Sequence, residues 1–224
     1  MRFLLFTILF LFQINSLEAV EFKGKFEQGS FILGKTDPST KIQVDDKEIR
    51  VSKEGYFAFG LGRDRKKDVV IKVIKNGKSK IFQKKVVKRE YKIQRIDGLP
   101  PKQVTPPPEV YKRIKKDNLL IGKARSIDTS YDFFKNKFIY PIDKYIITGV
   151  YGSQRILNGK PRRPHYGIDF HATEGTPVKA MMDGEVTLAI NDMYFTGGTI
   201  IFDHGHGIST LYMHMKDIKV KEGQ

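Results

Sequence analysis

The sequence predicts a mostly β protein, with a small antiparallel β-sandwich, a linker that contains a short helix, and a C-terminal β-sheet domain. Apolar and polar residues alternate over much of residues 49–60 and 69–87, as they do in half-buried strands. Glycines punctuate further β-rich runs in the C-terminal part, where no long helical period occurs. A run of prolines near residue 100 separates the two β-rich parts.

Residues 1–19 have the layout of a secretory signal peptide. A basic Arg2 precedes an apolar run over residues 3–12, and polar residues then lead to Ala19. The run is too short to span a bilayer comfortably, so we expect cleavage after Ala19. An uncleaved anchor stays open, because Leu17 is a middling residue at the third position before the cut. The chain has no cysteine, which leaves no disulfide and no lipid-modified cysteine. We expect an exported protein of the periplasm or cell envelope.

Residues 20–95 are expected to form the sandwich. Asn76-Gly77 lies between two β-branched runs and predicts a two-residue hairpin, because both positions tolerate positive φ. Further turns are expected at 36–39 and 53–55, and short strands with closely spaced turns are typical of a sandwich. The segment contains no histidine and no cluster of chemically active residues. It is therefore interpreted as a binding or spacer module.

Residues 96–128 are expected to form the linker. Five prolines between Leu99 and Glu109 predict a stiff, exposed start, since proline lacks a backbone donor. From Glu109 to Ile121 the sequence predicts one basic helix, which Gly122 stops. Such a helix can lie on an anionic surface, but packing against the neighbouring domain is the favoured interpretation.

The charge balance of the chain limits its partners. There are 40 Lys+Arg against 25 Asp+Glu, a formal net charge of +15. This balance is compatible with nucleic acid, an anionic membrane surface or an acidic polymer. The lysines are scattered along strand-like segments with no interleaved base-stacking motif, so we expect no nucleic-acid partner. A solvated lysine-rich surface is favoured, and peripheral contact with an anionic membrane or wall polymer stays open.

The histidines gather in the C-terminal domain, residues 129–224. They are His165, His171, His204, His206 and His214. His165 and Asp169 stand four apart, with a glycine and a β-branched isoleucine between them that argue against a helix. We expect a loop running into a strand, with Asp169 facing back to His165. Imidazole nitrogen and carboxylate oxygen are zinc donors, and the alternative is a hydrogen bond that closes a loop. On the residues alone, His214 could equally be a third ligand.

Three motifs around this pair occur in order over about residues 145–224. They are GVYGSQRILNG, then RRPHYGIDFHATEGTPVKAMMDGEV, then GGTIIFDHGHGISTLYMHM followed by VKEGQ. They resemble the lysostaphin-like (LytM-type) zinc metallopeptidases of the duplicated hybrid motif fold. The resemblance implies a β-sheet groove enzyme that hydrolyses peptide bonds of peptidoglycan, with His165 and Asp169 as ligands of Zn2+. It implies that His214 is the histidine that assists the attacking water and the transition state. The resemblance does not extend to the sandwich.

The remaining candidates are weighed against the same resemblance. By this resemblance His204 is expected to stabilise a turn. His206 is expected to be a surface residue, at a position where the family often has another polar residue. His171 stands where the family usually has a small residue, and it shares a strand face with Asp169, so it could line the groove. The pair Arg162–Arg163 could contact acidic substrate groups, although solvation is favoured.

The family's third zinc ligand is the second histidine of an H-x-H pair downstream of the VKxGQ segment. The sequence reaches Gln224 before such a pair, and His204 with His206 precede YMHM and belong to another turn. We therefore expect a truncated copy of a longer protein, with an incomplete C-terminal domain, a third ligand beyond Gln224 and no activity in this chain alone.

Three functions remain, in order of preference. The first is an exported zinc metalloendopeptidase that acts on peptidoglycan. The second is a non-catalytic LytM-like wall-binding protein or amidase activator. The third is a secreted β-module protein whose basic surface binds an anionic polymer or lipid.

Overall fold

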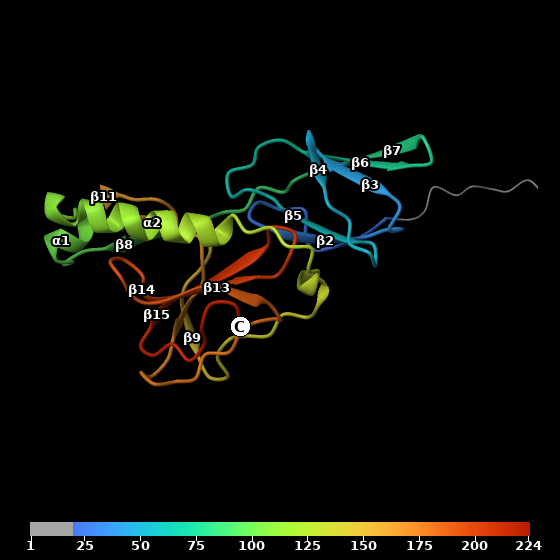
Figure 1. Cartoon of the computed structure of the whole chain (residues 1–224). Coiled ribbons are helices and arrows are strands. Elements are labelled where there is room, and N and C mark those ends of the chain that lie inside the picture. The colour runs from blue at the N-terminus through green and yellow to red at the C-terminus, as the bar shows by residue number, and fades with distance from the viewer. Residues whose placement is uncertain (1–19) are drawn as a thin grey trace, which may run out of the picture.

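The structure is a computed structural model that describes residues 20–224, and it confirms the mostly β fold class (Figure 1). The expected signal peptide, residues 1–19, lies outside the described residues. Figure 1 shows two β-rich lobes, with the long helix running alongside the second. Within residues 20–224, no helix has the length and apolar character needed to cross a membrane.

The N-terminal lobe consists of two antiparallel sheets. One sheet contains, in spatial order, β1 (Glu21–Lys23), β2 (Phe31–Lys35) and β5 (Tyr56–Gly60). The other contains β4 (Lys47–Ile49), β3 (Lys41–Val44), β6 (Val69–Lys75) and β7 (Lys78–Lys84). Alternate residues of both sheets form one core, in which Ile32, Ile42, Phe57, Val69 and Ile71 are fully buried. This arrangement is the predicted antiparallel sandwich.

The predicted hairpin is confirmed between β6 and β7. Asn76 and Gly77 have φ angles of 50° and 73°, the two consecutive positive values that a two-residue hairpin turn of this kind requires. The strands pair in register from Lys75 opposite Lys78 to Val69 opposite Lys84.

The linker differs from the expectation in two places. Residues 101–104 form a short helix, α1 (Pro101–Val104), because a proline at the first helical position needs no donor. After a 3-10 turn, η1 (Pro108–Val110), the long helix α2 (Tyr111–Arg125) runs through Gly122, so the predicted stop at this glycine is wrong.

Packing explains why α2 continues past the glycine. Ala124 is buried, and Leu120 and Ile121 pack with it against residues of the second lobe, namely Leu188, Met193 and Ile201. Burial of this apolar stripe outweighs the cost of about 1 kcal/mol for a glycine inside a helix. The favoured interpretation, a helix that packs on its neighbour, is confirmed.

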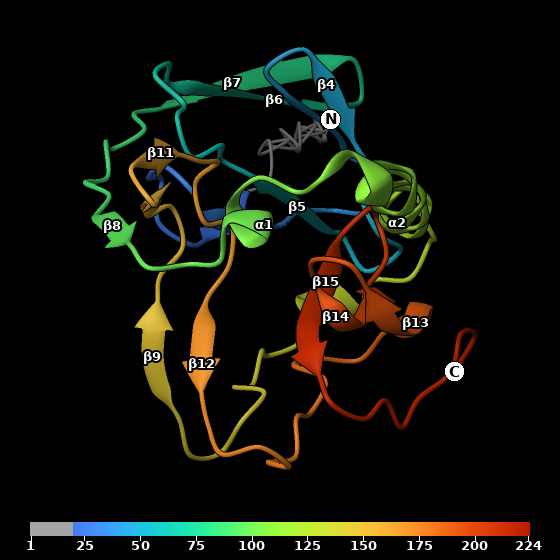
Figure 2. The ribbon, with the colours of Figure 1, turned by 90° about the vertical axis from the view of Figure 1, so that its left-hand side faces the viewer.

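The second lobe contains three small sheets. The first is antiparallel and joins β13 (Glu185–Met193), β14 (Gly197–Asp203) and β15 (Ser209–Met215). The second pairs β9 (Ile146–Gly149) with β12 (Asp169–His171), and the third places β10 (Gln154–Leu157) between β11 (Lys160–Pro161) and β8 (Ile93–Ile96). A 3-10 turn, η2 (Phe133–Lys135), lies between α2 and β9 in the chain. Figure 2 shows β9 and β12 side by side, apart from β13–β15.

Two parts of the β-rich runs expected in the C-terminal domain lie outside these strands. Residues 176–182 and 217–223 form no ladder. In the second run, Ile218 and Val220 pack against Val186 and its neighbours without extending the sheet.

The two lobes share a sheet. Strand β8 leaves the sandwich and pairs in parallel with β10, from Gln154 opposite Ile93 to Leu157 opposite Ile96. Arg50 also reaches across, with Nη2 2.9 Å from Asp128 Oδ2. The division into residues 20–95, 96–128 and 129–224 stays a prediction.

We expect Gly34→Ala to destabilise the sandwich. A Cβ at Gly34 would lie 2.1 Å from Phe57 Cζ in the closed core, and overpacking of this kind costs about 1–3 kcal/mol. The matched control is Gly60→Ala on neighbouring β5, where a Cβ would meet no atom within 4 Å and the change should lie within about 0.5 kcal/mol of wild type. Urea unfolding measures both, and equal effects would contradict the packing argument.

Candidate metal site

His165 and Asp169 face each other where a loop enters β12. His165 Nε2 lies 3.0 Å from Asp169 Oδ1. The His165 side chain is 8% exposed and that of Asp169 is 40% exposed. The predicted local geometry, a loop running into a strand with the carboxylate turned back to the imidazole, is therefore observed.

Backbone hydrogen bonds tie His165 to the turn before β10. Its N–H donates to Ser153 O over 2.9 Å, and its carbonyl accepts from Gly152 N over 2.7 Å. The ring Nδ1 is buried and has no hydrogen-bond partner among the described residues. A buried polar atom without a partner is unusual in proteins and often marks a position that another group fills.

The carboxylate of Asp169 occupies a space that β9 leaves open. Asp169 pairs with Gly149, and a Cβ on Gly149 would lie 2.2 Å from Asp169 Oδ2. This oxygen accepts a hydrogen bond from Arg155 Nη2 over 2.5 Å, while Arg155 Nε donates to Gln94 Oε1 over 3.2 Å. One carboxylate oxygen thus faces His165 and the other is fixed by a guanidinium.

Arg155 is the residue of this site that the sequence analysis missed. It lies inside the motif GVYGSQRILNG but fourteen positions before Asp169. No spacing rule links the two residues. Only the placement of β10 beside the start of β12 brings the guanidinium to the carboxylate.

The pair fits a partial zinc site. Imidazole nitrogen and carboxylate oxygen are zinc ligands with bonds of about 2 Å, so two ligands of one ion lie about 3 Å apart, as His165 Nε2 and Asp169 Oδ1 do. A catalytic zinc has three protein ligands. Within residues 20–224, no group of three or more His, Cys, Asp or Glu could hold a metal ion. The described part of the chain therefore brings together two side chains of the ligand type at this place.

His214 does not join this pair. It lies on β15 with its side chain exposed, a φ of 61°, and its N–H donated to Thr196 O over 2.8 Å. Strands β15 and β12 belong to different sheets, which Figure 2 shows on opposite sides of the lobe. The catalytic role of His214 stays a prediction.

His204 has the turn-stabilising position that was expected. It is fully buried, with Nδ1 2.6 Å from Asp183 O and Nε2 2.8 Å from Thr210 Oγ1. Both ring nitrogens are engaged, so the imidazole joins the start of β13 to β15. Burial lowers the pKa of His204.

Two expectations about neighbouring residues are wrong. His206 is half-buried rather than on the surface, because its ring packs 4.9 Å from that of the fully buried Phe134. Arg162 is not merely solvated, because Nη2 donates to Val104 O over 2.5 Å and holds the end of α1. His171 is exposed at the end of β12.

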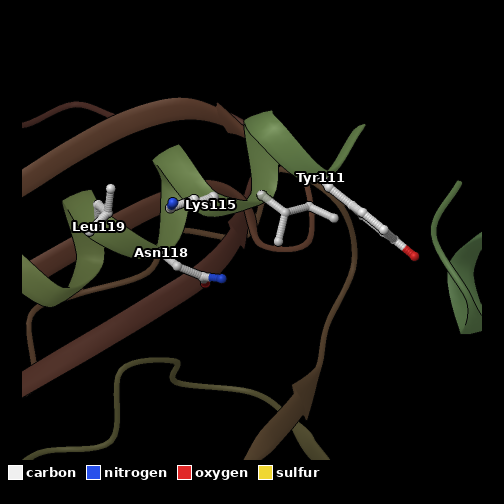
Figure 3. A pocket seen from close by; sticks show the side chains of 5 residues that line it. Tyr111, Lys115, Asn118 and Leu119 are labelled. Carbon is white, nitrogen blue, oxygen red and sulfur yellow. The ribbon is translucent and has the colours of Figure 1, made fainter. Parts of the chain in front are cut away.

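A hollow of about 380 Å³ lies along α2 (Figure 3). It is lined by Tyr111, Ile114, Lys115, Asn118 and Leu119. All five residues belong to one face of a single helix and include no histidine and no carboxylate. The hollow therefore has none of the donors found at His165 and Asp169.

The comparisons with known proteins agree with the sequence motifs. Residues 163–224 match the model described as Peptidase family M23. This segment is therefore similar to peptidase family M23. The resemblance to the LytM-type peptidases is confirmed at the level of the family.

Two relatives and one solved structure extend this result. This chain is 37% identical to peptidoglycan DD-endopeptidase ShyA of Vibrio cholerae over 87 residues, which are 38% of this chain and 20% of that protein. An uncharacterised metalloprotease of Buchnera aphidicola is 27% identical over 214 residues, 94% of this chain and 52% of that protein. A crystal structure from Pseudomonas aeruginosa, proposed to be an M23 peptidase, has a TM-score of 0.64 at 23% identity and covers 89% of this chain and 78% of that one.

These coverages bear on two further points. The chain spans about a fifth and about half of the two curated relatives, respectively. The Buchnera match extends into the sandwich, whereas the family model matches residues 163–224 only, so the expectation that the family resemblance does not reach the sandwich is not contradicted.

We expect His206 to make stability depend on pH. Burial and the nearby positive charge of Arg50 lower the pKa of His206 below its ordinary value of 6.5. The unfolded chain then binds more protons, so stability falls as the pH drops below about 6.5. His206→Asn removes this group, and asparagine tolerates the φ of 54°. Urea unfolding between pH 7 and 5 should show a smaller loss for the variant, and identical losses would contradict the assignment.

Proposed function

We propose that this chain contributes to an exported zinc metallopeptidase that hydrolyses peptide bonds of peptidoglycan. The observation that carries the proposal is the buried His165, which faces Asp169 at ligand distance inside the M23 segment. The relative from Vibrio cholerae is described as a peptidoglycan DD-endopeptidase, which supports the substrate class. The signal-peptide pattern of residues 1–19 supports export, since peptidoglycan lies outside the cytoplasm.

The residues have separate roles in this proposal. His165 and Asp169 hold the zinc, and a third protein ligand would come from outside residues 20–224. When bound, zinc supplies a Lewis acid that activates water and polarises the carbonyl of the scissile bond. Arg155 holds the Asp169 carboxylate in the orientation that faces His165. His214 takes up or delivers a proton, because an imidazole changes charge near neutral pH.

One observation favours a second candidate, a non-catalytic LytM-like protein that binds the wall or activates an amidase. No three possible ligands gather among residues 20–224, and a catalytic zinc needs three. A protein of this kind would bind peptidoglycan without cleaving it, and its binding would persist without zinc.

The peptidase proposal predicts loss of hydrolysis in His165→Ala and in Asp169→Ala. The protein, expressed from its natural reading frame, is incubated with purified peptidoglycan and the release of new amino groups is followed. Each variant, and a zinc chelator added to wild type, should lower the rate of hydrolysis at least 100-fold, because a site that lacks one ligand binds zinc poorly. The control Lys219→Ala changes an exposed residue that has no role in the proposed site and should keep the wild-type rate. Hydrolysis that survives His165→Ala would refute the proposal, and wall binding without hydrolysis would support the second candidate.

Arg155→Ala is expected to weaken zinc binding about 10–100-fold, the usual effect of removing a group that orients a ligand. Lysine at this position should restore part of the affinity, since it keeps a positive donor but cannot contact Asp169 and Gln94 together. Competition with a chromophoric chelator measures the dissociation constant. The exposed Arg163 provides the control substitution, Arg163→Ala. A wild-type constant in Arg155→Ala would show that the guanidinium has no part in zinc binding.

A further inference from the structure

We propose that the N-terminal sandwich positions the metal site, through a clamp made by Arg63 and Tyr91 on Gly152. This inference rests on the proposed function where it concerns zinc, and on the structure alone where it concerns the position of His165. It assigns a role to a lobe that the sequence analysis interpreted as a binding or spacer module. Arg63 and Tyr91 are positioning residues, because neither contacts His165 or Asp169 directly.

The first part of the clamp is a hydrogen bond from the sandwich to the turn before β10. Arg63 Nε donates to Gly152 O over 2.7 Å. The Arg63 side chain is 12% exposed, and its guanidinium carbon lies 4.3 Å from the centre of the Tyr91 ring. The Tyr91 hydroxyl donates to Arg63 O over 3.2 Å. The two side chains therefore hold one another before either of them contacts the turn.

The second part is the close approach of the Tyr91 ring to the same glycine. Gly152 has a φ of 87°, and a Cβ at this position would lie 2.0 Å from Tyr91 Cε1. The ring therefore lies directly against the backbone of the turn. Gly29 of the sandwich is similarly close to the next aromatic residue, since a Cβ there would lie 2.5 Å from Tyr151 Cε1. Two glycines, one on each lobe, thus permit a fit that any other residue would prevent.

The third part connects the clamped glycine to the metal ligand. Gly152 offers its carbonyl to Arg63, and it donates its N–H to His165 O over 2.7 Å. His165 in turn donates its N–H to Ser153 O over 2.9 Å. The path from the sandwich to the ligand is therefore two hydrogen bonds long and passes through a single residue.

The sandwich also orders β10, the strand after this turn. Gln154 donates its N–H to Lys92 O over 2.9 Å, and β10 continues this contact as a parallel ladder with β8. Because β10 carries Arg155, which holds Asp169, both ligands depend on backbone that the N-terminal half of the chain orders. Metal ligands must keep their geometry within about 0.5 Å, so loosening of this backbone should weaken binding.

A second contact between the lobes provides a matched control. Arg50 Nη1 donates to Thr129 O over 2.8 Å and Nη2 contacts Asp128 Oδ2 over 2.9 Å. Arg50 therefore joins the sandwich to the second lobe, as Arg63 does, but through a segment that does not hold His165. Loss of Arg50 tests docking of the lobes in general, whereas loss of Arg63 tests the clamp.

The experiment compares Arg63→Ala, Tyr91→Ala and Arg50→Ala in the full chain. Amide hydrogen exchange at Gly152 and His165 is measured without metal, and the zinc dissociation constant is measured by competition with a chromophoric chelator. Arg63→Ala and Tyr91→Ala should speed exchange at both amides at least 10-fold and raise the zinc constant about 10–100-fold. Arg50→Ala should match wild type in both. Tyr91→Phe keeps the ring on Gly152 and loses only the hydroxyl contact with Arg63 O, so its values should lie nearer to wild type than those of Tyr91→Ala.

The outcomes separate the clamp from the proposed function. If wild type binds no zinc but exchange at Gly152 and His165 rises in Arg63→Ala and not in Arg50→Ala, the clamp holds and the zinc proposal fails. The clamp would be overturned if Arg63→Ala and Tyr91→Ala left both amide exchange and zinc binding unchanged. It would also be overturned if Arg50→Ala changed both quantities as much as Arg63→Ala does. Should Arg63→Ala fail to fold, Arg63→Lys, which keeps one donor, gives an intermediate exchange rate if the clamp is correct and the wild-type rate if it is not.

Discussion

The pairing of Asp169 with Gly149 across β12 and β9 is the constraint on which the site depends. Any side chain at Gly149 would occupy the volume of the carboxylate, so the register of two short strands decides where Asp169 points. From this position its two oxygens face different groups, His165 on one side and Arg155 on the other. The position of Asp169 opposite His165 is thus set first by the pairing of the two strands and only then by the contacts of the side chains.

His165 and Asp169, the two proposed ligands, differ in burial and therefore in what each needs from the protein. Asp169 is partly exposed and can be hydrated, whereas His165 is almost enclosed and depends on what the protein provides. Its backbone is held by Gly152 and Ser153, and one ring nitrogen faces Asp169. The other nitrogen lacks a partner among the described residues, and a desolvated polar atom of this kind costs free energy unless another group binds it. The unpartnered nitrogen of His165 therefore lowers the stability of the fold, as features of functional sites often do.

Local patterns in the sequence predicted much of this structure, and contacts between distant segments account for the rest. The hairpin at Asn76-Gly77 and the turn of Asp169 toward His165 follow from residues that are neighbours in the chain. Two other features do not follow from chain neighbours. The continuation of α2 through Gly122 and the burial of His206 against Phe134 both depend on packing against another element. Arg155 was missed for the same reason.

The need for support from distant residues follows from the number of ligands. When three or four protein ligands hold an ion, a small displacement of one ligand matters less, because the other ligands fix the position of the ion. Among residues 20–224, His165 and Asp169 face each other and no third possible ligand joins them, so the orientation of each must be set in advance by its own supports. Arg155 provides this for the carboxylate and the Gly152 turn provides it for the imidazole. Since both supports are ordered against the N-terminal half of the chain, the M23 segment and the sandwich act as one structural unit.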